Sequence, residues 1–144
     1  NGHLAVVTKL IAAGALVDEA KTNGCTPLYI AAQNGHLTVV TKLIAAGALV
    51  DKAMTHGCTP LFVAAQNGHL IVVTKLIAAG ALVNKAKTTS GSTPLYIAAQ
   101  EGHTAIVSKL LQHGADKSIR GWQNKTPLEA AQGQNHAAVV ALLA

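Results

Sequence analysis

The sequence predicts an all-α solenoid, in which helix-turn-helix units stack on one another and hairpin-like fingers join them. The first observation is internal repetition, because residues 1–33 and 34–66 differ at only six of 33 positions. The second is a Thr-Pro-Leu tripeptide, and the third a Gly-His pair, each of which recurs once per unit. Self-similarity at this period is typical of one supersecondary unit stacked on copies of itself, which offers an extended side surface and no enclosed pocket.

We predict a single array over residues 1–144, divided into units 1–33, 34–66, 67–100 and 101–132 and a partial unit 133–144. The tripeptides begin at Thr26, Thr59, Thr93 and Thr126, and the Gly-His pairs begin at Gly2, Gly35, Gly68 and Gly102. Thr88–Ser92 holds one extra residue, and we interpret Gly133–Asn135 as a second insertion. Because the chain opens inside a unit, we expect it to be a fragment of a longer protein.

The sequence of each unit predicts two helices and a finger. Thr26 is a candidate N-cap, and the proline after it suits the first helical turn, so a first helix is predicted over Pro27–Asn34. Apolar residues then recur at helical spacing and predict a second helix over Leu37–Ala46. Ala48–Cys58 lacks helical periodicity and is interpreted as the finger.

These residues resemble the ankyrin repeat, whose consensus reads roughly G-x-TPLHxAAxxGHxxVVxxLLxxGAxxN. The matching residues are Gly24, Thr26, Pro27, Leu28, Ala31, Ala32, Gly35, His36, Val39, Val40, Leu43, Gly47 and Ala48. The resemblance recurs about four times and covers nearly the whole chain. It implies antiparallel helix pairs with fingers, stacked into a curved array. It also implies a non-catalytic scaffold that binds another protein through its fingertips and the first helices on the concave side.

The chain departs from that consensus at two positions of each unit. The histidine after Thr-Pro-Leu is replaced by Tyr29, Phe62, Tyr96 and Glu129. The aspartate near the start of the finger is replaced by Lys21, Met54, Lys87 and Gly121. We therefore expect hydrogen bonding that differs from the family's at the first helix, and fingers that are less rigid.

The near-identical units disagree mainly at their fingertips, whereas core positions stay almost fixed. Such variation on one surface fits recognition, although exposed loops also tolerate change. The candidate partner-binding residues are Lys21, Asn23, Met54, His56, Thr88, Thr89, Trp122, Gln123 and Lys125. Trp122 replaces small threonines of earlier units, so we expect it to face solvent or a neighbouring finger. The alternative function is a passive spacer or targeting module of a larger multidomain protein or effector.

No pattern in the chain predicts an enzyme, a metal site or a cofactor. Four histidines follow a glycine once per unit, about 10 Å apart, too far to share an ion whose ligands lie about 2 Å away. We interpret them as turn and cap residues. Cys25 and Cys58 have His56 nearby in sequence, but on a fingertip without a pocket or oxyanion donors. A glycine-rich phosphate loop after a strand is also missing.

The formal net charge is +5, and much of it comes from one lysine per second helix. These are Lys9, Lys42, Lys75 and Lys109. They predict a solvated face, or alternatively a weak preference for a partner with an acidic surface. Nucleic acid is not an expected partner, because the chain has no basic run and few aromatic residues for base stacking.

Cys25 and Cys58 occupy equivalent positions of adjacent units. Stacked helices lie about 8–10 Å apart, whereas a disulfide needs α-carbons within about 7 Å. We therefore predict free thiols that react with a thiol reagent in the folded protein. Free thiols suit a reducing setting, so we expect an intracellular, cytoplasmic location.

The longest uncharged apolar stretch, Leu43–Val50, is far shorter than the roughly 20 residues of a membrane span.

The C-terminal segment His136–Ala144 carries no Lys, Arg, Asp or Glu, although terminal repeats normally present a polar outer face. The chain also starts with the second helix of a unit. We therefore predict that the 144-residue fragment self-associates end to end.

Overall fold

The structure is a computed structural model that describes residues 3–144, so Gly2 of the first Gly-His pair lies outside the described range. Within that range the regular elements are helices and no strand is present, which confirms the all-α prediction. The elements are α1 (Leu4–Ala12), α2 (Pro27–Gln33), α3 (Leu37–Ala45), α4 (Pro60–Gln66), α5 (Leu70–Ala78), α6 (Pro94–Gln100), α7 (Thr104–Gln112), the short 3-10 turn η1 (Trp122–Asn124), α8 (Pro127–Gly133) and α9 (Ala137–Leu143). The predicted helices thus end one residue early, with Asn34 and Ala46 as C-caps.

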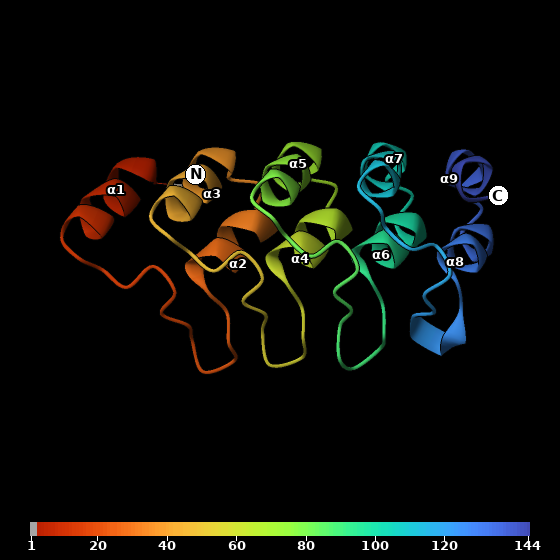
Figure 1. Ribbon diagram of the computed structural model, residues 1–144, viewed down its shortest axis with the longest axis horizontal. Coiled ribbons are helices and arrows are strands. Elements are labelled where there is room, and N and C mark those ends of the chain that lie inside the picture. The colour runs from red at the N-terminus through yellow and green to blue at the C-terminus, as the bar shows by residue number, and fades with distance from the viewer. Residues whose placement is uncertain (1–2) are drawn as a thin grey trace.

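The helices form two parallel rows (Figure 1). One row holds the outer helices α1, α3, α5, α7 and α9, and the other holds the inner helices α2, α4, α6 and α8. Neighbouring inner helices pack on one another, and each inner helix also packs on the outer helix that follows it in sequence. The fingers all extend from the side of the inner helices, so the fingertips line one long edge of the molecule.

The Thr-Pro-Leu tripeptide begins each inner helix, as predicted. The hydroxyl oxygen of the threonine accepts a hydrogen bond from the backbone N–H three residues later, at 3.1–3.2 Å in all four units. Proline follows at the first helical position, where no N–H is needed. In α8 the Glu129 carboxylate also accepts from the Thr126 N–H at 2.7 Å, which completes a reciprocal capping box.

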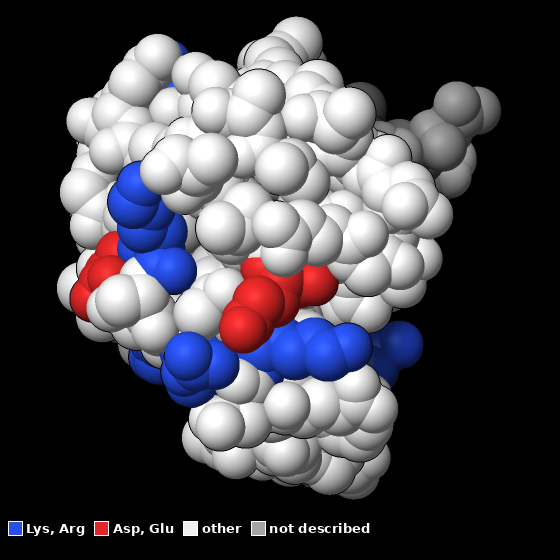
Figure 2. Space-filling view, turned by 90° about the vertical axis from the view of Figure 1, so that its right-hand side faces the viewer, with Lys and Arg blue, Asp and Glu red and all other residues white. Residues whose placement is uncertain are grey.

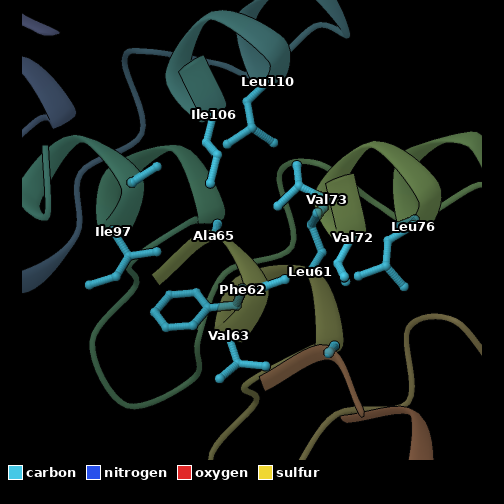
Figure 3. Packing of buried hydrophobic residues seen from close by; sticks show 14 of the residues in the cluster. Leu61, Phe62, Val63, Ala65, Val72, Val73, Leu76, Ile97, Ile106 and Leu110 are labelled. Atoms are coloured by element: carbon cyan, nitrogen blue, oxygen red, sulfur yellow. The ribbon is translucent and has the colours of Figure 1, made fainter. Parts of the chain in front are cut away.

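The core is a strip of apolar side chains between the two rows. The tripeptide leucines of the first three inner helices have no exposed surface, and neither do the valines that face them from the outer helices. These residues are Leu28, Leu61 and Leu95, and Val40, Val73 and Val107. Figure 3 shows how side chains of α4, α5 and α7 converge on this interior. Full burial of each such side chain stabilises the fold by about 1.5–3 kcal/mol.

The histidines that precede α5, α7 and α9 join one helix pair to the next and do not cap their own helices. Nε2 of His69, just before α5, lies 2.9 Å from the backbone oxygen of Gln33 at the end of α2. His103 and His136 make the same contact with Gln66 of α4 and Gln100 of α6, so each ring reaches the inner helix of the preceding helix pair. No side-chain cap bond is present at the outer helices that follow them. We interpreted these histidines as turn and cap residues. That interpretation is wrong about the hydrogen-bond partner of the ring, because the ring reaches across the unit boundary.

Successive fingers are also joined to each other. The Thr55 N–H donates to the Asn23 carbonyl and the Thr88 N–H to the His56 carbonyl, both at 3.1 Å. Each finger closes on itself as well: in the first, the Lys21 N–H donates to the Cys25 carbonyl at 3.0 Å. These bonds hold the fingers despite the loss of the consensus aspartate.

The interpretation of Gly133–Asn135 as an insertion is corrected by the structure. Asn135 has φ +60 and stands where Gly35 has φ +71, and His136 then makes the same contact with the preceding helix pair as His69 and His103. The fourth unit therefore keeps the register of the others. Asparagine is one of the few residues besides glycine that tolerate this left-handed conformation, so the glycine that marks the turn elsewhere is missing from the sequence.

Both cysteines are free, as predicted, but they are not exposed. Cys25 and Cys58 each keep 7% of their surface and lie at the bases of the fingers. Burial raises the pKa of the Cys58 thiol, and the Tyr29 hydroxyl donates a hydrogen bond to its sulfur at 3.7 Å. The expectation that both thiols react in the folded protein assumed accessible fingertips and is wrong on that point. Over residues 3–144, no helix is long and apolar enough to traverse a lipid bilayer.

Candidate binding surface

The fingertips place eight of the nine candidate residues on the surface. Lys21, Asn23, His56, Thr88, Thr89, Trp122, Gln123 and Lys125 are exposed. The ninth, Met54, is only partly exposed and packs against the hydrophobic core. Its backbone also lies against the preceding finger, since a Cβ on Gly24 would come within 3.0 Å of the Met54 Cα. Met54 therefore also has a packing role, and all nine residues remain candidates.

Some of the exposed candidates also hold their fingers in shape. The side-chain oxygen of Asn23 accepts from the Cys25 N–H at 3.0 Å, which closes the tip of the first finger. Thr88 packs its methyl group against Gly57, where an added Cβ would come within 2.8 Å. Because substitutions at Asn23 or Thr88 would disturb these contacts, they are poor probes of binding.

The fourth finger presents a fixed, exposed indole. The Trp122 side chain is 57% exposed, while both polar groups of its backbone are bonded to the preceding unit. The Trp122 N–H donates to the Ser92 hydroxyl oxygen, and the Trp122 carbonyl accepts from the Tyr96 hydroxyl, each at 3.1 Å. The prediction that this residue faces solvent is confirmed.

Close packing next to the indole reinforces this arrangement. A Cβ on Gly121 would lie 2.8 Å from both Ser92 Oγ and Tyr96 Cδ2, so only glycine allows the finger to sit this close to α6. Tyr96 is 2% exposed, and burial raises the pKa of its hydroxyl. The finger is thus anchored on a buried aromatic ring, and the hydroxyl stays a hydrogen-bond donor at neutral pH.

The tip beyond Trp122 is strained. Gln123 and Asn124 have φ of +56 and +58. Asparagine tolerates this left-handed conformation, but for Gln123 it costs about 1–3 kcal/mol. Bonds on both sides hold the turn, because the Gly121 N–H donates to the Lys125 carbonyl at 2.8 Å and Arg120 donates to the Asn124 carbonyl at 2.7 Å. Strain that surrounding contacts maintain is typical of recognition loops.

A small cavity lies between this fingertip and the ends of two inner helices. Its volume is about 210 Å³, and polar atoms supply most of its wall. It is lined by Tyr96, Gln100, Trp122, Gln123, Lys125, Ala130, Gly133 and Gln134. This cavity is smaller than the roughly 300 Å³ at which pockets for drug-sized ligands begin, so it has room for a side chain rather than a cofactor.

Arg120 and Glu129 form an ion pair beside the cavity, at 3.2 Å and about half exposed. The Thr126 N–H and hydroxyl hold the pKa of the Glu129 carboxyl below its usual value, with smaller contributions from Arg120 and Lys125. Figure 2 views the C-terminal end and shows acidic and basic side chains gathered in a band across its middle. Above that band the surface carries almost no charge, in keeping with an α9 that has no charged residue.

A larger apolar hollow of about 460 Å³ lies at the other end, against α2. There Pro27 is exposed and Ile30 is 37% exposed, whereas their counterparts Pro60 and Val63 are buried beneath the preceding inner helix. The hollow is therefore the surface on which units stack, and we assign it no ligand. Among residues 3–144, no three His, Cys, Asp or Glu side chains come together as metal ligands.

Sequence reasoning missed four residues of the fourth fingertip and its cavity: Ser92, Tyr96, Gln100 and Gln134. One signal was present, because Ser92 replaces the cysteine that stands before Thr-Pro-Leu in the first two units, and its hydroxyl oxygen accepts from the Trp122 N–H. Gln100 carried no signal, since glutamine recurs at the end of each of the first three inner helices.

Comparison with known families identifies the class of protein that this fold defines. A family model described as ankyrin repeats (3 copies) matches residues 1–87 and 72–144, which together span the whole chain. The chain belongs to the ankyrin repeat family. A comparison with individual curated proteins gave no significant match.

Proposed function

We propose that this chain is a non-catalytic scaffold that binds a partner protein through its fingertips and the adjacent ends of its inner helices. Ankyrin repeats generally mediate protein–protein interaction, and this array has the family's architecture. The observation that carries the proposal is Trp122. Its aromatic side chain is 57% exposed, while its backbone N–H and carbonyl are both hydrogen-bonded. Tryptophan is among the residues most enriched in binding hot spots.

The test compares the chain with a Trp122→Ala variant. A partner is first captured from lysate on the immobilised wild-type chain, and its affinity for purified wild-type and variant chains is then measured by calorimetry. We expect Trp122→Ala to weaken binding at least about tenfold. The melting temperature should stay nearly unchanged, because Trp122 is 57% exposed. Thr89→Ala is the matched control, since Thr89 is an exposed fingertip residue without a bulky side chain.

A large drop in melting temperature together with unchanged affinity would show that Trp122 is structural. Failure to capture any specific partner would favour the alternative function, a passive spacer or targeting module of a larger protein or effector. In that case substitutions at all the exposed fingertip candidates should leave the behaviour of the parent protein unchanged.

Two further features of the partner and setting belong to this proposal. The excess of basic residues favours a partner with an acidic surface, and salt should weaken that preference because exposed charges are screened. The two free thiols favour a reducing, intracellular compartment, which we propose to be the cytoplasm.

A further inference from the structure

We propose that the cavity of the fourth unit is a subsite for an acidic side chain on an extended segment of the partner, with Lys125 as its charge partner and Trp122 as its apolar wall. This inference rests on the proposed function and adds the chemistry of the ligand. The 210 Å³ cavity lies between a fingertip that supplies Trp122 and Lys125 and two inner-helix ends that supply Gln100 and Gln134. One side chain fits such a volume.

The charge of the cavity favours a carboxylate. Within residues 3–144 the only ion pair joins Arg120 to Glu129, so the Lys125 ammonium has no salt-bridge partner of its own. Oε2 of Glu129 already accepts from the Thr126 N–H at 2.7 Å and from Arg120 at 3.2 Å. No acidic residue lines the cavity; Glu101, next to Gln100 in sequence, is exposed outside that lining. A carboxylate that enters therefore meets the Lys125 ammonium and no acidic side chain in the cavity wall, while Glu129, whose pKa Lys125 helps to lower, lies outside that lining.

The amides favour an extended segment. Glutamine ends each of the first three inner helices, at Gln33, Gln66 and Gln100. Their backbone oxygens are bonded to His69, His103 and His136 of the following helix pairs. Their side-chain amides are left to donate to and accept from a ligand. Inner helices stack about 8–10 Å apart, while three residues of a polyproline II segment advance about 9.3 Å. An extended peptide can thus present every third residue to successive units.

The site is prepared before any ligand arrives. Tyr96 and Ser92 fix the backbone of Trp122, and Gly121 seats the finger against the ring of Tyr96. A fixed aromatic wall loses little conformational entropy on binding, so even a small contact contributes to affinity.

The test uses Trp122 itself, the only tryptophan of the chain, as a fluorescent reporter. The probe is an acetylated and amidated peptide of three Pro-Pro-Glu triplets, and its control is the same peptide with glutamine in place of glutamate. We expect the glutamate peptide to shift the emission saturably with a Kd of about 1 mM or lower, and the glutamine peptide to bind about fivefold more weakly. Raising the salt concentration should reduce that difference.

Two substitutions separate the parts of the site. Lys125→Gln should abolish the preference for glutamate, whereas Lys109→Gln, the same change on an outer helix, should preserve it. Gln100→Ala should weaken both peptides alike, because its amide contacts the peptide backbone. The proposal is overturned if the two peptides bind equally, if no saturable shift occurs up to about 10 mM peptide, or if Lys109→Gln acts like Lys125→Gln. Any of these results together with a tenfold loss of partner affinity in Trp122→Ala would reject the acidic subsite and leave the proposed scaffold function standing.

Discussion

The Tyr96 hydroxyl donates a hydrogen bond to the Trp122 backbone carbonyl at 3.1 Å, from a ring that is 2% exposed to an indole that is 57% exposed. This bond crosses from the inner helix of the third unit to the tip of the fourth finger. One hydrogen bond therefore links the buried Tyr96 ring to the backbone that holds the exposed Trp122 side chain.

Tyr96→Phe should remove that bond and keep the packing of the ring. Phe62 occupies the equivalent position of the second unit, which shows that the fold accepts a ring without a hydroxyl. We expect the free energy of unfolding to fall by about 0.5–1.5 kcal/mol in urea titrations. The fluorescence anisotropy of Trp122 should also fall as the fingertip gains motion. Unchanged anisotropy would mean that the Ser92 bond and Gly121 packing fix the finger without Tyr96.

Leu43→Ala should destabilise the fold strongly. Leu43 is 3% exposed on α3, and truncation of a buried leucine leaves a cavity that costs about 2–5 kcal/mol. The matched control is Leu49→Ala, six residues later, where the side chain is 59% exposed and the loss should stay within about 0.5 kcal/mol. Thermal and urea unfolding measure both. Equal effects of the two substitutions would refute the assignment of the buried face of α3.

The cysteines should react slowly with a thiol reagent in the native protein and quickly in urea. Both thiols are 7% exposed, and the raised pKa of Cys58 leaves little of the reactive thiolate at neutral pH. Mass spectrometry after timed alkylation follows each site. Fast native labelling would show that the finger bases open readily, and an intramolecular disulfide would contradict the stacking geometry.

The sequence was sufficient for features that local chemistry specifies. The Thr-Pro-Leu tripeptide predicts an inner helix because the capping hydroxyl and the proline act within one turn, and all four such helices are present. The period of the repeat predicts the stacking, since each unit must cover the apolar face of its neighbour. Exposed fingertips follow from the same reasoning.

Contacts that cross from one unit to the next could not be read in this way. The partial burial of Met54 depends on the adjacent finger, and the fixed backbone of Trp122 depends on Ser92, thirty residues earlier. The hydrogen-bond partner of the histidines could not be predicted, because the carbonyl that His69 contacts lies at the end of α2, in the preceding helix pair. The turn at Asn135 was missed because the other units mark the same left-handed conformation with glycine.

Glu129→Gln should flatten the dependence of stability on pH in the acidic range. Hydrogen bonds from Thr126 lower the pKa of the folded Glu129 carboxyl, so its ionised form is favoured by folding. That stabilisation is present above the unfolded pKa of about 4.3 and is lost as pH falls through the lower folded value. Glutamine still accepts the capping hydrogen bond but does not titrate. Urea unfolding from pH 6 to pH 3 should show a smaller decline for the variant, and parallel declines would contradict this linkage.

The 144-residue chain should self-associate weakly through its ends at high concentration. Helix α1 buries none of its residues, and Val6 and Leu10 on it are each 54% exposed. At the other end, α9 has no charged residue and exposes Leu142 at 41%. The contact area is small, so we expect monomers at micromolar concentration and larger species near about 1 mM by light scattering. Leu10→Glu should keep the chain monomeric throughout, because a charge is costly to bury in such a contact. A wild-type chain that remains strictly monomeric at 1 mM, or a Leu10→Glu variant that associates as strongly, would refute association through these ends.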